Sequence, residues 1–598
     1  MEVDVWGLAV LAVLYAVILG IGIYAAKVSK ARSDAVSIQE GEQQEEASDM
    51  LMVANRKLST FVGVCTMTAT FICGSYINGT AQSVAEQGLV WTLAPPGIFL
   101  GMIIGGLFFA KKMRDQNYIT FLDPFEKRFG EKMTGLLFIA AFCADMFWSA
   151  SVLAALGTSI AVIVGLDTRI AIVASAIVAI IYTVLGQMLS VAYTDVVQLA
   201  FMSFGLLLGI PFVLTNEHVG SIMEGSDQWL GTIENKQIAV WIDFFIVMIF
   251  GSIPWQSYFQ RVLSARSGTQ AQYFSIIGSF GAFLLAIPPV LIGAAGSVAN
   301  WTAVGDGVSP LDVAAGGDAS MVLPLVLHSF TPRAVSLLGL CALSAAVMSS
   351  IDSAILGSSS MFTHNIYRTL LRSSASSSEL LRVQRGAVVV VGGVACAISL
   401  TVTSVLGMFV IAADVVFVAL LPQLVAVVYC TEGAANTYGS LAGLVVAVLL
   451  RLGAGEPLLG LPPLIYYGAL YDAELGHLFP YRTFAMLASL ATIVAVSSAA
   501  WWLFVTRGTS RRWDVLGCFV GGRPLLVVDG CSVMGSIRSA EERKDTNCTC
   551  KTDPEIKFTN CGNRCSEVGC EVGAGDSSLN GCAKAVPAWN GERTSHRS

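Results

Sequence analysis

The chain has 598 residues, of which 55% are hydrophobic and only 13% are charged, whereas a soluble domain carries about 25% charged residues. A soluble core cannot hide this much apolar surface, so the composition indicates a membrane protein. The formal net charge of −7 excludes a nucleic-acid binder, which needs a basic face. Only five His are present, and there is neither a nucleotide-binding loop nor a nucleophile elbow. An enzyme, a bound cofactor and ATP as the energy source are therefore not expected.

Apolar windows of spanning length recur along the chain, and a membrane helix needs about 20 such residues. The first window lacks a basic n-region, so it is expected to be a retained span and not a cleaved signal peptide. Thirteen windows are expected to cross the bilayer: 6–26, 60–82, 89–112, 135–165, 169–188, 191–215, 238–260, 272–299, 335–362, 386–406, 408–430, 438–455 and 483–505. Residues 1–506 are thus predicted to form a transmembrane transporter domain.

Basic residues orient these windows, because Lys and Arg concentrate in cytoplasmic loops. With the N-terminus outside, most basic residues fall in the cytoplasmic loops, Arg261 among them. The outer loops then hold only Arg169, Lys236, Arg333, Arg451 and Arg482. An odd number of spans places the C-terminus in the cytosol.

Two glycosylation sequons lie within residues 1–506. Asn300-Trp301-Thr302 lies on a predicted outer loop, so Asn300 is expected to carry a glycan. Asn78-Gly79-Thr80 lies inside a predicted helix and is interpreted as accidental.

Residues 507–598 differ in character from the rest of the chain. They are polar and contain eight of the 14 cysteines. We expect a disordered cytosolic tail. The alternative is a zinc knuckle, although the cysteines do not follow a paired CxxC spacing. Its ligands would be Cys548, Cys550, Cys561, Cys565, Cys570 and Cys582.

Two predicted spans contain residues that interrupt helices. Residues 68–79 of the second window combine glycines with small polar side chains, and residues 251–256, five windows later, contain Pro254. Proline removes a backbone donor and kinks or breaks a helix. Two broken helices at this offset are typical of the five-plus-five inverted repeat of transporters, although Gly and Pro are common in membrane helices generally. Carbonyl oxygens exposed by unwound backbone must be satisfied, and a sodium ion suits them.

Ionisable residues inside spans are costly and indicate functional sites. Asp195 and Asp352 lie within predicted spans, and Asp145 shares a helix face with Trp148. Asp243 lies near a span end, where it can reach the interface. The hydroxyls of Ser349, Ser350 and Ser353 are candidate ion ligands; alternatively, these small residues let helices pack closely.

Aromatic residues within spans suggest a cation site. The face of an indole ring attracts a desolvated ammonium by about 2 kcal/mol or more. Trp148 and Trp255 lie beside a carboxylate and a helix break, respectively. The alternative is a place in the interfacial aromatic belt, which suits Trp91 better.

The chain resembles the sodium/solute symporter family from about residue 5 to 505. The motifs that carry the resemblance are typical of its choline-transporting branch and lie at residues 76–80, 106–111, 190–199, 253–256, 258–263, 344–350, 436–439 and 455–457. The resemblance implies an all-α, LeuT-like fold with about thirteen spans. It also implies sodium-coupled, chloride-dependent uptake of choline by alternating access. The implied location is the plasma membrane, with synaptic or endosomal vesicles as a second one.

The resemblance also implies site residues. A sodium site would use the backbone carbonyls of Ala69 and Ile72 with Ala346, Ser349 and Ser350, and Asp195 would be a second sodium-linked position. An aromatic cage would be formed at Phe71, Ile98, Trp148 and Trp255, beside Asp145. Phe71 stands where the family has Trp, and Ile98 stands where it has Tyr. Phe offers a weaker π face than Trp, and Ile keeps only bulk.

Three functions follow as alternatives. The first is a sodium-coupled transporter of choline or another quaternary amine. The second is a symporter of the same fold for a different small organic solute. The reason to consider it is that Phe71 and Ile98 replace two aromatic residues of the family's cage. The third is a membrane sensor or scaffold that uses its tail to recruit partners, and the ion-site residues argue against it.

Overall fold

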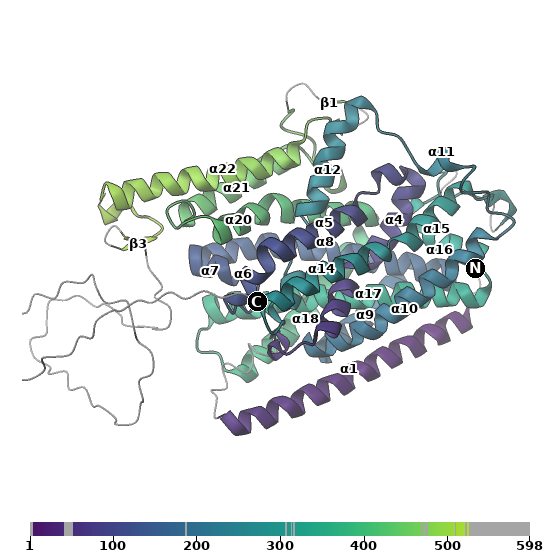
Figure 1. The fold of residues 1–598 in the computed structure, drawn as a ribbon, viewed down its shortest axis with the longest axis horizontal. Coiled ribbons are helices and arrows are strands. Elements are labelled where there is room, and N and C mark those ends of the chain that lie inside the picture. Colours follow the sequence, from purple (N-terminus) through teal and green to yellow (C-terminus); the bar gives the residue numbers. More distant parts are fainter. Residues whose placement is uncertain are drawn as a thin grey trace, which may run out of the picture. The chain divides into compact units, whose positions relative to one another are not determined.

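The computed structural model describes residues 4–40, 52–185, 188–304, 308–312, 314, 317–402, 404–467, 471–472, 476–508, 510–520 and 523–524. Within the compact unit formed by residues 1–527, the described chain is mainly helical, and the long helices lie side by side (Figure 1).

The α-helices are α1 (Val5–Glu40), α3 (Thr60–Phe71), α4 (Gly74–Glu86), α5 (Ala94–Ile104), α6 (Lys111–Asp115), α7 (Asp123–Phe129), α8 (Glu131–Val164), α9 (Thr168–Leu185), α10 (Met188–Leu214), α11 (Ser226–Trp229), α12 (Ile238–Phe250), α13 (Gln256–Leu263), α14 (Gly268–Leu284), α15 (Ile287–Val298), α16 (Val322–Phe330), α17 (Arg333–Met361), α18 (Ser377–Thr401), α19 (Val405–Val415), α20 (Leu421–Tyr429), α21 (Thr437–Gly453) and α22 (Tyr481–Trp501). Wider π-helical turns extend four of them: η3 (Gly105–Ala110), η8 (Phe362–Leu371), η9 (Val416–Leu420) and η11 (Trp502–Thr506).

The remaining elements are short. The 3₁₀ turns are η1 (Ala54–Arg56), η2 (Leu89–Trp91), η4 (Asn235–Gln237), η5 (Trp301–Ala303), η7 (Ala319–Met321), η10 (Pro457–Leu459) and η12 (Arg511–Trp513). Two antiparallel hairpins pair β1 (Tyr471–Asp472) with β2 (Gly476–His477) and β3 (Phe519–Val520) with β4 (Arg523–Pro524).

The predicted spans correspond to helices. Among the described residues, nine helices are long and apolar enough to cross a membrane, and the bent pair α3–α4 makes a tenth. The windows at 169–188 and 438–455 fall on helices with shorter apolar stretches, Thr168–Ile181 and Thr437–Gly453. The all-α polytopic architecture is confirmed, whereas the count of thirteen crossings stays a prediction. None of the thirteen predicted windows includes α16, a short apolar helix before α17.

Both predicted helix breaks are present. Helices α3 and α4 are bent by 51° relative to each other, and five residues separate the end of α12 at Phe250 from the start of α13 at Gln256. The two breaks lie at equivalent positions of the two halves, as the inverted repeat requires.

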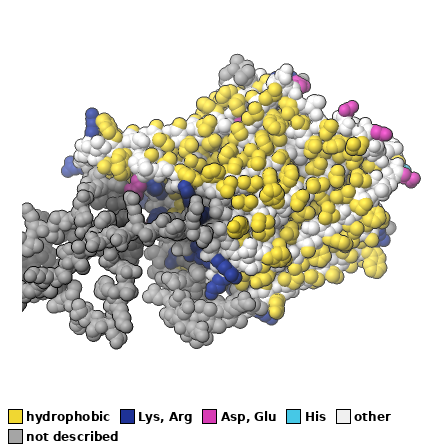
Figure 2. Space-filling view, viewed as in Figure 1, with side chains coloured by type: hydrophobic (Ala, Val, Ile, Leu, Met, Phe, Trp, Pro, Cys, Tyr) yellow, Lys and Arg dark blue, Asp and Glu magenta, His cyan; other side chains and the backbone are white. Residues whose placement is uncertain are grey.

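The centre of the unit is α17, which packs against α8, α10 and α3, while α1 packs on the outer side of α10 and α9 (Figure 1). Apolar side chains cover the visible face of the described helices (Figure 2). Lys and Arg gather toward the end that holds α6 and α7, and Asp and Glu toward the other end. This separation of charge at the two helix ends fits a body that crosses a membrane.

Two of the arginines assigned to loops from the sequence, Arg261 and Arg451, are buried, and a third, Arg482, is half-buried. Arg261 is fully buried on α13. Arg451 Nη2 and Arg482 Nε bind the same Asp414 Oδ2 at 2.7 and 2.9 Å, and Asp243 Oδ2 accepts the Arg482 backbone N–H at 3.3 Å. The loop assignment of Arg261 was wrong, because a buried carboxylate pairs with its guanidinium group inside the protein, a tertiary feature that span counting does not see. The outer side expected for Arg451 and Arg482 stays a prediction.

The first residues of the predicted tail are ordered. Asp514 Oδ1 accepts a hydrogen bond from Tyr438 Oη at 2.8 Å, and Asp514 Oδ2 accepts the Phe519 N–H at 2.7 Å. The Phe519 ring stacks on Phe504 with centroids 5.3 Å apart. Residues 510–520 therefore dock on α21 and η11, although a disordered tail was predicted from 507. The cysteines of the zinc alternative, from Cys548 onward, lie outside the described residues.

Candidate substrate and ion site

The first helix break is built from small and capping residues. Helix α3 ends at Phe71, because Ile72 leaves the helical region at φ −86° and ψ 74°. Helix α4 restarts with Cys73 as its N-cap, whose Sγ accepts the Tyr76 N–H at 3.2 Å. Gly74 is required here, since a β-carbon at this position would lie 2.4 Å from Val347 Cγ2 on α17. The break therefore lies directly against α17.

The second break spans residues 251–255. Trp255 has extended backbone angles (φ −110°, ψ 137°) just before α13. Its indole Nε1 donates to Gly251 O at 2.6 Å. Pro254 cannot donate a backbone hydrogen bond, so the segment stays unwound and directs the Trp255 ring sideways from the helix axis.

A cavity of about 40 Å³ lies between the two breaks. All four positions of the expected cage line it. Its full lining is Thr70, Phe71, Cys73, Ile98, Trp148, Met248, Gly251, Ser252, Trp255, Ser257, Phe409 and Ala413. Residues from α3, α5, α8, α12, α13 and α19 thus converge on one space.

Two indole rings form the main wall of this cavity. Trp148 and Trp255 meet edge to face, with centroids 5.2 Å apart and planes at 61°. The Phe71 ring packs edge-on against Tyr258 at 6.1 Å. Phe409 adds another ring to the lining. Sequence reasoning missed it because Phe409 lies in an apolar run, where no neighbouring polar residue or helix break distinguishes it from other apolar residues.

Asp145 does not line the cavity. Its Oδ2 accepts a hydrogen bond from Ser358 Oγ on α17, and the side chain is buried. Asp145 and Trp148 do share one face of α8, as predicted. Asp145 lies about one turn away from Trp148, however, and at that position its carboxylate is outside the cavity lining. No carboxylate lines this cavity among the described residues.

The residues expected at the sodium site lie around the first break. Ala69, Ile72, Ala346, Ser349 and Ser350 are all buried. Ser350 Oγ donates to Thr70 O at 3.3 Å, which brings α17 within hydrogen-bond distance of the carbonyls at the end of α3. Carbonyl and hydroxyl oxygens of this kind are suitable ligands for a hard cation.

Asp195 lies next to this group in a fully buried network. Its Oδ1 accepts from Ser349 Oγ at 2.6 Å, and Thr66 and Arg261 both contact its Oδ2. The Arg261–Asp195 ion pair, at 3.3 Å, has no exposed surface on either side chain. Sequence reasoning missed Arg261 because it placed this residue in a loop.

Asp352 and Ser353 extend the network along α17. Thr183 Oγ1 donates to Asp352 Oδ1 at 2.9 Å. Ser353 Oγ donates to Ser349 O at 2.7 Å and accepts from Arg261. These side chains link α9, α13 and α17 through polar contacts at the centre of the unit.

A larger hollow of about 360 Å³ adjoins the cavity and shares Met248 and Phe409 with it. Its outer part includes Glu86, Trp91 and Arg482, on the side that the basic residues predict to be external. On the other side, Phe121 stacks on Phe259 at 5.4 Å, and the Phe121 N–H donates to Gln256 Oε1 at 2.7 Å. Met248 and Phe409 thus lie between the cavity and the outer hollow, and the stacked rings of Phe121 and Phe259 lie beside the residues that begin α13.

The fold and the paired helix breaks define a polytopic membrane protein with a LeuT-like inverted repeat. The fold is that of a solved Na⁺-coupled sialic acid symporter, with a TM-score of 0.66 and 19% identity, covering 83% of this chain and 98% of that one. The model of the sodium:solute symporter family matches residues 51–447. The chain belongs to this family.

Within the family, the chain is similar to proteins named high-affinity choline transporter 1. The Drosophila melanogaster protein is 43% identical over 522 residues, covering 87% of this chain and 82% of the relative. The Homo sapiens protein is 42% identical over 531 residues, covering 87% and 89%.

Proposed function

We propose that this chain takes up choline, a small organic cation, by symport with sodium, and that uptake depends on chloride. The observation that carries the proposal is the convergence of Phe71, Ile98, Trp148 and Trp255 on one cavity between the two helix breaks. The names of the similar proteins point to the same substrate.

The lining of the cavity suits a permanent cation held by aromatic faces. Choline cannot release its charge, so the site must replace its hydration shell without a proton transfer. Indole faces do this when water is excluded, and Trp148 and Trp255 supply two of them. With no carboxylate among the described lining residues, π faces would provide the electrostatic attraction.

Sodium would bind beside the cavity, at the carbonyls of Ala69 and Ile72 and at Ala346, Ser349 and Ser350. The contact between Ser350 and Thr70 supports this placement, because it joins the ion site to the helix that carries Phe71. Asp195 would then be a second sodium-linked position, with Arg261 balancing the charge of its carboxylate when no ion is present.

Alternating access would open the cavity to one side at a time. Movement of Phe409 and Met248 would connect it to the outer hollow, and separation of Phe121 from Phe259 would connect it to the cytosol. A negative interior favours entry of a cation by about 2.3 kcal/mol per charge per 100 mV. The sodium gradient adds to this driving force.

A second candidate is a symporter for another small solute, and Ile98 favours it. An aliphatic side chain at a cage position removes one π face, which suits a substrate with less exposed charge.

Uptake of labelled choline, betaine and carnitine tests the proposal in cells that express the full chain. We expect choline uptake that falls to background when potassium replaces sodium or gluconate replaces chloride. Trp255→Ala should abolish uptake at normal surface expression, whereas Trp6→Ala, at a 71% exposed position on α1, should not. Normal choline uptake by Trp255→Ala would show that the cage lies elsewhere, and selective uptake of betaine or carnitine would favour the second candidate.

A further inference from the structure

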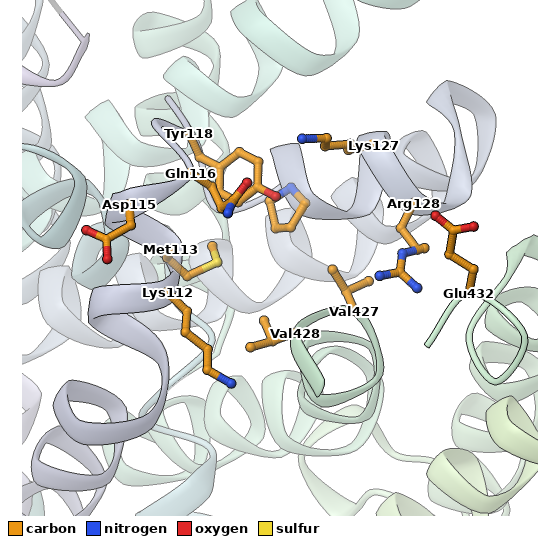
Figure 3. A pocket seen from close by; sticks show the side chains of 11 residues that line it. Lys112, Met113, Asp115, Gln116, Tyr118, Lys127, Arg128, Val427, Val428 and Glu432 are labelled. Carbon is orange, nitrogen blue, oxygen red and sulfur yellow. The ribbon is translucent and has the colours of Figure 1, made fainter. Parts of the chain in front are cut away.

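A second large hollow, of about 540 Å³, lies away from the transport cavity (Figure 3). It is formed by α6, α7 and the end of α20, and it shares no lining residue with the transport cavity or the outer hollow. Two spans end here, Leu89–Asp115 and Val405–Tyr429. The hollow therefore lies at the membrane–water boundary, on the side that the basic residues predict to be cytosolic.

Three cationic side chains surround this hollow. Figure 3 shows Lys112 on one side of it and Lys127 and Arg128 on the other. Neither Lys112 nor Arg128 forms an ion pair with any described residue. Lys112 Nζ lies 3.6 Å from the centre of the Tyr429 ring, and Arg128 Nη1 donates to Cys430 O at 3.3 Å. A guanidinium has five donors, so most of those on Arg128 stay available.

Two carboxylates also line the hollow, and their positions differ. Asp115 lies at the opposite end from Glu432, and its carboxylate is turned away from the hollow (Figure 3). A β-carbon on Gly268 would lie 2.5 Å from Asp115 Oδ1, so this carboxylate rests against the N-terminus of α14, where a helix stabilises negative charge. Of the two lining carboxylates, the one that lies beside Arg128 at the hollow is therefore that of Glu432.

The hollow connects with the lipid-facing surface through Lys112. Tyr429, under its ammonium group, donates through its hydroxyl to Phe108 O at 2.7 Å. Phe108 and its neighbour Leu107 are 53% and 52% exposed on η3. A molecule with a charged head in the hollow would have an apolar surface for its tail directly next to it.

We propose that this hollow binds the headgroup of a phosphorylated inositol lipid from the cytosolic leaflet. Basic pockets between spans at this face bind such headgroups, and Arg pairs with phosphate through two parallel hydrogen bonds. The volume lies in the range of small-molecule sites, about 300–1,000 Å³, which is more than a serine headgroup needs. The bound lipid would bridge α6 and α7 to the α20–α21 connection. This inference is independent of the transported substrate.

Native mass spectrometry of the purified full chain in detergent tests this site by titration with dioleoyl phosphatidylinositol 4,5-bisphosphate. The pocket variant is Lys112→Gln with Arg128→Gln. The control variant, Lys132→Gln with Arg385→Gln, removes the same charge at exposed positions outside the hollow. We expect one tightly bound lipid on the wild type and the control, and at least tenfold weaker binding to the pocket variant at an unchanged melting temperature. Should the pocket variant not fold, Lys127→Gln alone is expected to weaken binding at least threefold.

Two further ligands identify what the site recognises. Dioleoyl phosphatidylserine should bind at least tenfold more weakly than the inositol lipid, and soluble inositol 1,4,5-trisphosphate should also bind more weakly because it lacks the acyl chains. Equal lipid binding by the pocket and control variants would overturn the proposal. Equal affinity for phosphatidylserine, or for the soluble trisphosphate, would overturn the assignment to an inositol lipid.

Discussion

The indole rings of Trp148 and Trp255 come from different halves of the repeat and meet in one cavity wall. Each is placed by its own element, one by a continuous helix and the other by an unwound segment. Phe71 and Ile98 complete the wall less fully than Trp and Tyr would. The affinity of the site for an ammonium therefore depends on how much π surface these two positions supply.

Restoring the rings should tighten binding. Phe71→Trp with Ile98→Tyr is expected to favour choline by about 1–2 kcal/mol, which lowers its KM roughly five- to thirty-fold. Uptake kinetics measure this change. The matched control is Phe61→Trp, at a 69% exposed position on α3, which should leave KM unchanged. An unchanged or higher KM in the double variant would mean that the cavity does not hold the ammonium.

Ser349 and Ser350 should govern the response to sodium. Ser349→Ala and Ser350→Ala each remove a hydroxyl oxygen from the proposed ion site, so the sodium concentration for half-maximal uptake should rise several-fold. Ser336→Ala is the control, because Ser336 is buried on the same helix and its hydroxyl has no hydrogen-bond partner among the described residues. If both site variants kept the wild-type sodium dependence, these serines would not be ion ligands.

At the scale of elements, close helix contacts position the breaks. Helices α5 and α12 touch through Gly97 and Gly101, a spacing that lets backbones approach. A β-carbon on Gly101 would lie 2.1 Å from Ile249 O, and one on Gly97 would lie 2.4 Å from Met248 Cβ. Since Met248 lines the cavity and α5 carries Ile98, this contact sets the width of the site.

Gly101→Ala should therefore destabilise the protein. Overpacking of a tight contact costs about 1–3 kcal/mol, and the backbone carbonyl of Ile249 cannot move without shifting α12. The melting temperature of the detergent-solubilised protein should fall, and choline uptake should fall with it. Gly393→Ala on α18, where no atom lies within 4 Å of the added carbon, should preserve both. Equal melting temperatures for the two variants would argue against this contact.

Across the whole molecule, the charge distribution predicts the orientation in the membrane. Asn300 is exposed, and Thr302 Oγ1 donates to Asn300 Oδ1 at 2.7 Å. Asn78 is buried, and its Nδ2 donates to Ala155 O at 3.1 Å. The first sequon is accessible to a glycosylating enzyme in the folded protein, and the second is not.

Asn300→Gln should therefore remove the glycan, seen as a faster-migrating band that glycosidase no longer shifts, whereas Asn78→Gln should retain it. An epitope after Ser598 should resist protease added outside intact cells. Digestion of that epitope without permeabilisation would reverse the predicted orientation.

Local sequence was sufficient for the features that depend on near neighbours. Apolar runs predicted the helices, because lipid-facing and core-facing residues in a membrane are both apolar. Gly and Pro predicted the two breaks, because they act on the backbone at their own position. The family motifs selected four positions that line one cavity, which no periodicity in the chain would have grouped.

Tertiary structure alone decided which polar side chains meet. Arg261 and Asp195 lie far apart in sequence and pair only because α13 packs near α10 and α17. Asp145 turned toward Ser358 and away from the cavity, and Phe409 joined the lining from α19. The pairing of buried charges and the lining of a cavity depend on how helices cross. These crossings are difficult to predict from a uniformly apolar sequence, because its residues are alike on every face of the helix.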